Sequence, residues 1–324
     1  MPLAEIPLSV WRTLGHDFVF GGQNIRYWVA GQGDPLLLIH GFPTASWDWH
    51  YLWQPLSRRY RVIACDMLGF GDSAKPRDHQ YSLLEQADLQ QALLEHLQVN
   101  RPVHVLAHDY GDSVAQELLA RHDEGRFDMA SCVFLNGGVF PEQHRPLTVQ
   151  KLLLSRLGWL TARMFNRDSL DRDFSRTFGA ETRPSESELD DFWSLISASR
   201  GHHILYRLIG YIPERLIQRE RWVQAMQRTL VPIRFIAGAA DPVSGEHMLE
   251  RYHELIPNPD TILLPGIGRY PHAEAPELLL HHYEGFRAAV AGFRPAVVVQ
   301  HVAQNGKPAN HPFALSSVIQ SASC

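Results

Sequence analysis

Short apolar runs alternate with longer amphipathic segments through much of the chain. The runs have the length of buried strands, and they cover residues 36–39, 62–64, 103–107, 132–135, 233–237 and 261–264. Helical candidates such as 83–97 and 113–121 lie between several of them. This alternation predicts an α/β fold with a mostly parallel central sheet that helices cover on both faces. Residues 18–20 and 25–30, joined by a Gly-Gly-Gln-Asn turn, predict a hairpin before that sheet.

The alternation stops near residue 140. From there to about 228 the pattern is helical, with candidate helices at 150–164, 186–198 and 204–209. Apolar strands resume at 233, so we predict a helical cap, residues 140–228, inserted between the core segments 1–139 and 229–293. The tail, residues 294–324, is rich in small and polar residues. It either lacks regular structure or adds an edge strand at 296–299.

Composition changes this picture little, but it excludes several kinds of partner. The 324 residues are 45% hydrophobic, which is enough for one large core with a small second lobe. The net charge is -5 and no basic run occurs, which argues against nucleic acid and anionic membranes as partners. No stretch has the pattern of a signal peptide or a membrane span. We therefore expect a cytoplasmic protein that acts on a small molecule.

The sequence predicts no metal site and no cofactor. The 18 histidines include the adjacent pairs His202-His203 and His281-His282, whose members would point to different faces of a helix. Neither an HExxH motif nor a clustered Cys/His spacing occurs. The three cysteines do not form a disulfide framework.

The run at 103–107 leads into Asp109, and a helix begins directly after it. Ala107 and Gly111 stand two positions to either side, which is the spacing of a nucleophile elbow with Asp in place of Ser. Small neighbours allow a sharp, strained turn, so that the side chain projects from the carboxyl edge of the sheet. The helix N-terminus behind it would favour negative charge. An aspartate that merely caps the helix is the alternative.

Two further stretches fit a hydrolytic site built around this turn. Residues 37–43 form a strand that runs into a His-Gly-Phe-Pro loop, where the Phe42 N–H could join the Tyr110 N–H in an oxyanion hole. Asp241 follows a late strand and could orient a catalytic histidine. An elbow, an oxyanion loop and an acid in this order and spacing favour a nucleophile over a helix cap.

Several neighbouring residues have weaker assignments. His40 in the oxyanion loop, with Trp47 and Trp49 after it, could line the substrate pocket. Core packing is the alternative for the two tryptophans. Asp112 is interpreted as structural because it lies in the first turn of the helix, where negative charge is favoured. The mixed charges at 214–221 are interpreted as a solvated face of the cap.

These motifs resemble the Asp-nucleophile branch of the α/β-hydrolase superfamily, which contains epoxide hydrolases and haloalkane dehalogenases. The matching stretches are HGFPTASWDW (40–49), GFGDSAKPR (69–77), HDYGDSVAQELL (108–119), NGGVFPEQHRPL (136–147), TRPSESEL (182–189) and DPV (241–243). The resemblance runs from about residue 35 to 286 and includes the predicted cap. It implies an α/β-hydrolase fold with an inserted helical cap.

The resemblance also implies a mechanism. Asp109 would attack an electrophilic carbon and form an alkyl-enzyme ester. A water molecule activated by a histidine would then hydrolyse the ester while the oxyanion hole holds the tetrahedral charge. Asp241 would orient that histidine, because the place that holds this acid in some dehalogenases looks like Asn136 here.

Within this branch the residues favour epoxides over haloalkanes. Epoxide hydrolases typically protonate the leaving alkoxide with cap tyrosines, and Tyr206 and Tyr211 lie in the predicted cap, where packing is the alternative role. Dehalogenases tend to carry Trp after the nucleophile and a halide-binding donor such as Asn after the oxyanion glycine. This chain has Tyr110 and Phe42 at those places. A haloalkane dehalogenase-type hydrolase is the alternative.

One position departs from the family pattern. The base should stand in a Gly-His-x-Pro-His-x-Glu stretch after the last strand, but residues 268–274 are GRYPHAE, so Arg269 occupies the histidine position. Arginine stays protonated and cannot act as a general base, although it could pair with Asp109 or Asp241. Three interpretations follow: a hydrolase that forms the ester but hydrolyses it slowly, a transfer of the base role to His272, or a catalytically silent ligand-binding relative.

Overall fold

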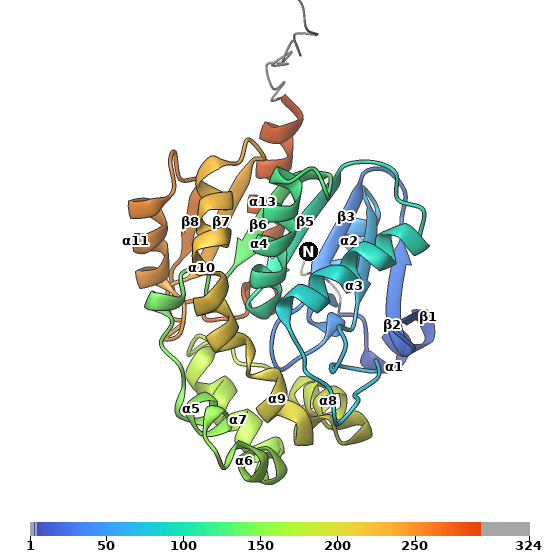
Figure 1. Cartoon of the computed structure of the whole chain (residues 1–324), viewed down its shortest axis with the longest axis vertical. Coiled ribbons are helices and arrows are strands. Elements are labelled where there is room, and N and C mark those ends of the chain that lie inside the picture. The colour runs from blue at the N-terminus through green and yellow to red at the C-terminus, as the bar shows by residue number, and fades with distance from the viewer. Residues whose placement is uncertain (1–2, 4, 293–324) are drawn as a thin grey trace, which may run out of the picture.

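The computed structural model describes residue 3 and residues 5–292, and one eight-stranded sheet forms its centre (Figure 1). The strand order is β1-β2-β4-β3-β5-β6-β7-β8. The strands are β1 His16–Phe20, β2 Gln23–Ala30, β3 Pro35–Ile39, β4 Arg61–Cys65, β5 Val103–His108, β6 Met129–Leu135, β7 Ile233–Gly238 and β8 Thr261–Leu264. Two neighbouring pairs, β1 with β2 and β2 with β4, are antiparallel, and the other pairs are parallel. The prediction of a mostly parallel sheet is confirmed.

The central strands come from unbroken apolar runs because both of their faces are covered. Every residue of β3 and β5 is buried, so neither strand needs a polar face. The predicted hairpin is β1 and β2, and its turn is tighter than expected. Gly21 and Gly22 adopt φ of 54° and 77°, which glycine tolerates, and β2 therefore begins at Gln23.

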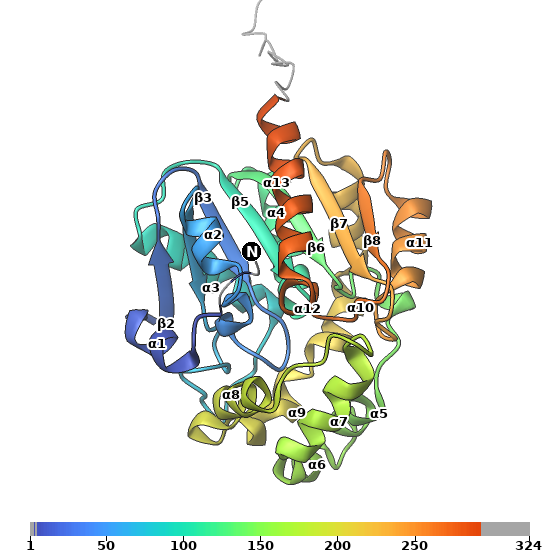
Figure 2. The ribbon, with the colours of Figure 1, turned by 180° about the vertical axis from the view of Figure 1, so that it is seen from behind.

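Helices pack on both faces of the sheet, as predicted. The α-helices are α1 Leu8–Leu14, α2 Trp53–Ser57, α3 Leu83–His96, α4 Tyr110–Asp123, α5 Thr148–Leu154, α6 Gly158–Met164, α7 Arg167–Thr177, α8 Glu186–Ser197, α9 Leu205–Leu208, α10 Tyr211–Arg228, α11 Glu246–Leu255, α12 Pro271–Glu274 and α13 Pro276–Gly292. Short 3-10 helices are η1 Ser46–Trp49, η2 Pro141–Gln143 and η3 Ala198–Ile204. α3, α4 and α10 lie on the face seen in Figure 1, whereas α2 and α13 lie on the face seen in Figure 2.

The helices α5 to α9, called the cap helices below, lie together beyond one end of the sheet in both views (Figures 1 and 2). The single helix expected at 150–164 is two helices, α5 and α6. The chain leaves the helical path at Ser155, whose backbone is extended, and it resumes at Gly158. A Cβ at Gly158 would lie 2.0 Å from the Leu153 carbonyl oxygen, so this turn requires glycine.

The helix α10 also falls within the segment 140–228, but it packs along α4. The Trp222 indole N–H donates to the Glu117 carboxylate at 2.9 Å, and Arg221 forms an ion pair with the same carboxylate. The segment therefore contains the cap helices and one helix that lies against the sheet layer. The predicted tail, residues 294–324, lies outside the described residues. In the part that the structure describes, no helix combines the length and apolarity that crossing a membrane requires.

Candidate active site

Asp109 lies on the turn between β5 and α4. Its φ of 51° and ψ of -103° are strained for a residue other than glycine, and such strain is typical of functional turns. The backbone at the end of β3 comes very close to Gly111. A Cβ at Gly111 would lie 2.5 Å from the Ile39 carbonyl oxygen. The sequence pattern of small residues around Asp109 thus corresponds to a sharp strand-to-helix turn. The Asp109 side chain makes no hydrogen bond that would cap α4.

The Asp109 carboxylate is fully buried, and it is held by donors on both oxygens. The Phe42 N–H donates to Oδ2 at 3.1 Å. The Arg269 guanidinium donates through Nη2 to Oδ1 at 2.5 Å. A second guanidinium, that of Arg215, lies 3.8 Å from Oδ1. Such a charged group needs these partners because burial of an unpaired carboxylate is costly.

One of the two expected oxyanion donors, the Phe42 amide, contacts this carboxylate, and Tyr110 follows Asp109 directly in the chain. Phe42 follows Gly41 in the loop after β3, and its amide donates to Oδ2 of Asp109. Tyr110 is the first residue of the 14-residue helix α4, so its amide belongs to the positive end of the helix. The oxyanion hole, in which both amides would face charge that develops on Asp109, stays a prediction.

Asp241 lies beyond β7 in a dense set of hydrogen bonds. Its carboxylate accepts from the backbone amides of Val243 at 2.8 Å and Ser244 at 3.2 Å, and from the Ser244 hydroxyl at 3.0 Å. The Asn136 side chain adds another donor at 3.1 Å. These bonds fix the orientation of a carboxylate that is 3% exposed. Asn136, which stands at the alternative acid place, therefore supports Asp241.

Arg269 bridges the two aspartates. Its Nη1 lies 3.2 Å from Oδ2 of Asp241, and its Nη2 lies 2.5 Å from Oδ1 of Asp109. Burial alone would lower the pKa of Arg269, but the two carboxylates outweigh burial and raise this pKa above its ordinary value. The guanidinium therefore stays charged at every ordinary pH. It holds the place of the expected base without being able to accept a proton.

Arg215 is a site residue that the sequence interpretation missed. It comes from α10 in the stretch that was expected to be a solvated cap face, yet only 1% of it is exposed. Its Nη2 donates to the Asp109 carbonyl oxygen at 2.8 Å, and its Nε donates to the Ser113 hydroxyl at 2.6 Å. The guanidinium also lies over the Tyr211 ring, 4.6 Å from its centre. Arg215 thus links α10 to the backbone of the turn that carries Asp109.

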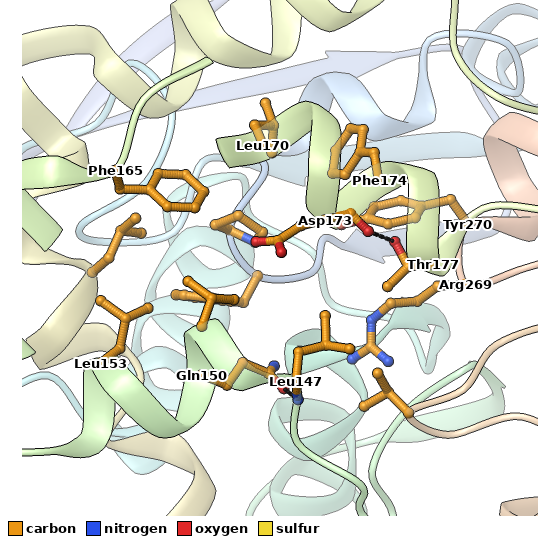
Figure 3. Close-up of a pocket in the computed structure, with 15 residues that line it drawn as sticks. Leu147, Gln150, Leu153, Phe165, Leu170, Asp173, Phe174, Thr177, Arg269 and Tyr270 are labelled. Carbon is orange, nitrogen blue, oxygen red and sulfur yellow. Dashed lines mark hydrogen bonds between the residues drawn. The ribbon is translucent and has the colours of Figure 1, made fainter. Parts of the chain in front are cut away.

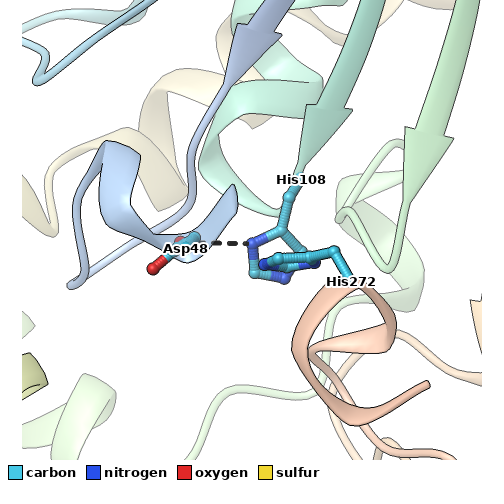
Figure 4. A group of neighbouring side chains, drawn as sticks. All are labelled: Asp48, His108 and His272. Atoms are coloured by element: carbon cyan, nitrogen blue, oxygen red, sulfur yellow. Dashed lines mark ion pairs between the residues drawn. The ribbon is translucent and has the colours of Figure 1, made fainter. Parts of the chain in front are cut away.

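His272 does not lie at Asp109, which corrects its assignment as a substitute base. It stands on α12 beside His108 (Figure 4), where its ring packs 4.3 Å from the His108 ring. The same ring lies 4.7 Å from the Trp49 ring. Among the described residues no hydrogen bond joins it to Asp109 or Asp241. Arg269 precedes the short helix α12 and His272 lies within it, and the two side chains have different partners. Burial, and then the electrostatic effect of the neighbouring His108 ring, lowers the pKa of His272 well below its usual range.

His272 forms a buried polar cluster with Asp48 and His108, whose ligand-type atoms all lie within 4.8 Å of one another. His108 donates through Nε2 to the Arg269 carbonyl oxygen at 2.9 Å, which leaves Nδ1 facing Asp48 at 3.9 Å. Bonds of about 2.1 Å to a tetrahedral zinc ion would place ligand atoms roughly 3.4 Å apart. The 3.9 Å between Nδ1 of His108 and the Asp48 carboxylate is wider than this spacing, so these two atoms are not placed for a common zinc ion.

His40, Trp47 and Trp49 are not among the residues that line the cavity of the site, contrary to expectation. Both His40 ring nitrogens are used within the core, one with the Gly41 carbonyl at 2.9 Å and one with the Met67 amide at 3.0 Å. Burial lowers the pKa of His40 to about 4, so the ring is neutral and positions the oxyanion loop. Trp47 donates to the Ile6 carbonyl, and Trp49 packs on His272. The indoles are thus part of the core under the loop.

A cavity of about 500 Å³, including its open mouth, lies between the cap helices and the core (Figure 3). Cap-side residues that line it are Leu147, Val149, Gln150, Leu153, Phe165, Leu170, Asp173, Phe174, Thr177 and Leu205. Core-side residues that line it are Phe42, Pro43, Val243, Arg269 and Tyr270. This wall is mostly aliphatic and aromatic, which suits a small apolar ligand. Phe42 and Arg269 connect the cavity to Asp109, since both bond to its carboxylate.

The two tyrosines that were expected in the cap take different places, because Tyr206 lies on the cap helix α9 and Tyr211 begins α10. Tyr211 is buried beside the elbow, where its ring lies 5.0 Å from Tyr110 and 5.6 Å from Phe42. Burial, followed by the Asp109 charge, raises the pKa of Tyr211 above its usual value. Tyr206 instead pairs with the neighbouring Arg207, whose Nε donates to its hydroxyl at 3.0 Å. The expectation that both hydroxyls share the site is therefore wrong for Tyr206.

The geometry agrees with comparisons to known proteins. The mesoderm-specific transcript protein of Mus musculus is 43% identical over 298 residues, which cover 88% of this chain and 89% of that protein. The cis-3-alkyl-4-alkyloxetan-2-one decarboxylase of Shewanella oneidensis is 26% identical over 277 residues, 82% of this chain and 85% of its own. The crystal structure of the haloalkane dehalogenase DatA from Agrobacterium tumefaciens superimposes with a TM-score of 0.73 at 19% identity, covering 85% of this chain and 96% of that one. The profile of the alpha/beta hydrolase fold matches residues 34–276, and the chain belongs to this family.

Proposed function

We propose that this chain uses Asp109 as a nucleophile to open a small apolar electrophile, with an epoxide as the favoured class, and that it forms a covalent alkyl-enzyme ester. The observation that carries the proposal is the setting of the Asp109 carboxylate. It stands on a strained turn at φ 51°, and it accepts a hydrogen bond from the Phe42 amide at 3.1 Å. A helix cap would need neither the strain nor a donor from another loop.

The nucleophile in the first half of the cycle is Asp109 itself. Its ionised carboxylate attacks a carbon of the substrate, and the C–O bond of the epoxide opens. The amides of Phe42 and Tyr110 are available for the later step, in which water adds to the ester carbonyl and negative charge develops on its oxygen. Asp241 and Arg215 hold Arg269 and the elbow in place through the contacts described above.

The second half of the cycle lacks its expected base, and we propose that Arg269 makes hydrolysis of the ester slow. A histidine at this place would take a proton from the attacking water, whereas a guanidinium cannot. General-base assistance typically accelerates such a step by about 10² to 10⁴-fold. The ester is therefore expected to persist long enough to be detected on the intact protein.

The proposed substrate class rests on the cavity and on the chemistry of a relative. The cavity wall is mostly apolar, so it suits a short hydrocarbon chain that carries one reactive polar group. The Shewanella relative takes its name from an oxetan-2-one, a strained ring that contains oxygen. An epoxide is likewise a strained oxygen ring with electrophilic carbon atoms, which agrees with this preference.

A direct test is incubation with a panel of epoxides and haloalkanes, followed by mass measurement of the intact protein. The proposal predicts an adduct with the mass of the epoxide, located by peptide mapping at Asp109. The Asp109→Asn variant is the control and should remain unmodified. Absence of an adduct with every member of the panel would overturn the proposal.

A catalytically silent ligand-binding protein is the second candidate, and one observation favours it. Asp109 itself does not line the cavity, and the Arg269 guanidinium occupies one of its oxygens. A ligand could therefore fill the cavity without reaching the carboxylate. Saturable binding of an epoxide, with no covalent adduct and with unchanged ligand after release, would support this second function.

A further inference from the structure

Asp173 places a carboxyl group on the otherwise largely apolar wall of the cavity. It stands on the cap helix α7, and Figure 3 shows its carboxyl group directed away from the helix and into the cavity. Arg269 lines the same cavity from the core side. A molecule in the cavity therefore lies between the Asp173 carboxyl group and the site around Asp109.

Asp173 also reaches the surface of the cap. Together with Val149 and Phe165 it lines a second hollow, which opens between α5, α6 and α7. The same three residues thus separate the cavity from this outer hollow. Because Asp173 is only partly buried, it can exchange its proton with solvent between reaction cycles.

The surroundings of Asp173 make it a weak acid suited to neutral pH. Burial raises the pKa of Asp173 to about 6, although the nearby Arg176 and Arg172 oppose this effect. Arg269 and Tyr270 are the other charged or titratable side chains that line the cavity. With that pKa, about a tenth of the molecules carry the proton at pH 7. General acids work best when their pKa lies near the operating pH.

The tyrosine hydroxyls near the cavity are less well suited than Asp173 to donate a proton to the substrate. Tyr270 lines the wall, but its ring stacks on Phe178 at 4.8 Å, and burial raises its pKa well above the usual value. Tyr206 and Tyr211 are not among the lining residues. The Tyr206 hydroxyl is thus paired with Arg207, and Tyr211 and Tyr270 have pKa values raised above the usual one, mainly by burial.

We propose that protonated Asp173 is the general acid for epoxide opening, an inference that rests on the proposed function of Asp109. An Asp109 oxygen forms a bond to a ring carbon, and the carbon–oxygen bond breaks with its electron pair moving to the ring oxygen. The proton passes from Asp173 to that oxygen. The products are a β-hydroxyalkyl ester on Asp109 and a carboxylate at Asp173, which regains its proton from solvent through the outer hollow.

The leaving group gives a sharp test. An epoxide needs a proton for its departing oxygen, whereas bromide departs from an alkyl bromide as a stable anion. We would measure adduct formation by intact mass with epoxyhexane and with bromohexane for the wild type, Asp173→Asn and Asp171→Asn. Asp171 stands exposed on the same helix, so its variant controls for the loss of one negative charge.

Asp173→Asn should slow alkylation by epoxyhexane at least about 10²-fold and leave alkylation by bromohexane within about twofold. Asp171→Asn should resemble the wild type with both reagents. In the wild type, the epoxide rate should fall as pH rises above about 6 while the bromide rate stays level. An unchanged epoxide rate in Asp173→Asn, or equal slowing with both reagents, would overturn the acid role. No adduct with either reagent in the wild type would overturn the proposed function, and this inference with it.

Discussion

The Arg269 guanidinium lies 2.5 Å from the Asp109 carboxylate, in a contact that is almost completely buried. The same guanidinium reaches Asp241 at 3.2 Å, so one cation pairs with two carboxylates in the position of the expected base. Removal of one partner from such a buried pair leaves an uncompensated charge, which is strongly destabilising. With the Arg215 guanidinium 3.8 Å from Asp109, two cations face two carboxylates, and neither cation can accept a proton from water.

Arg215→Met should destabilise the protein by about 3 kcal/mol. Arg215 is buried, and its loss leaves the Ser113 hydroxyl and the Asp109 carbonyl without this donor. Arg219→Met, one turn later on α10, is the matched control because its ion pair with Glu142 is about one-third exposed. That control should change the free energy of unfolding by less than about 1 kcal/mol. Urea unfolding of both variants checks the prediction, and equal effects would contradict it.

Gly111→Ala should destabilise the elbow by about 1–3 kcal/mol. The added Cβ would lie 2.5 Å and 2.7 Å from the backbone oxygens of Ile39 and His40, and neither atom belongs to a flexible side chain. Gly285→Ala on α13 is the opposite case, since a Cβ there meets nothing within 4 Å. It should stabilise the protein by about 1 kcal/mol through helix propensity. Thermal unfolding should therefore shift in opposite directions, and a stable Gly111→Ala variant would refute the close approach.

Asp112→Asn should stabilise the protein at neutral pH. Burial raises the pKa of Asp112 well above its usual range, and the Asp109 charge acts in the same direction. A raised folded-state pKa gives a contribution that is fully present below the unfolded pKa of about 3.9 and is lost as pH rises toward the folded pKa. Asn cannot ionise, and its oxygen can still accept from the Leu135 amide. Urea unfolding should show that the gain in the free energy of unfolding grows between about pH 4.5 and pH 7. A loss of unfolding free energy that does not depend on pH would contradict this account.

Tyr206→Phe should leave the rate of epoxide alkylation within about twofold of the wild type. Its hydroxyl is occupied by Arg207 at 3.0 Å, and it does not line the cavity. The rate of adduct formation by intact mass is the measurement. A tenfold or larger fall in that rate, which general acids of this kind would produce, would return Tyr206 to the proton-donor role.

The sheet could be predicted from the sequence because its strands are covered on both faces. Strands such as β3 and β5 then appear as unbroken apolar runs, and these runs are distinct from the mixed pattern of the helices. The elbow could be predicted as well, because small residues at fixed distances from Asp109 are a local requirement of the backbone.

The residues that were missed depend on where side chains point in three dimensions. Arg215 lies in a stretch that looks solvent-exposed, because a long charged side chain that reaches inward leaves no mark on the polar pattern. Tyr206 and Tyr211 were both assigned to the site, but they lie on separate helices, because α9 ends at Leu208 and α10 begins at Tyr211. His272 was assigned wrongly as a substitute base, because its ring on the short helix α12 packs against His108 and Trp49.

Asp173 could not be identified from the sequence for the same reason. An aspartate within the polar helix α7, between Arg172 and Phe174, resembles the neighbouring surface residues in sequence. Only the packing of the cap over the core reveals that its carboxyl group faces the cavity. Its raised pKa follows from that packing and could not be anticipated from the residue types alone.

The lifetime of the covalent adduct tests the central claim most directly. Wild-type protein, Arg269→His and Arg269→Gln would be loaded with epoxyhexane, freed of excess reagent and followed by intact mass. The account predicts a persistent adduct in the wild type and in Arg269→Gln. In Arg269→His the adduct should decay at least about tenfold faster and release the diol, because a histidine can take the proton of the attacking water. An adduct that decays equally fast in the wild type and in Arg269→His would contradict the claim that Arg269 limits the second half of the cycle.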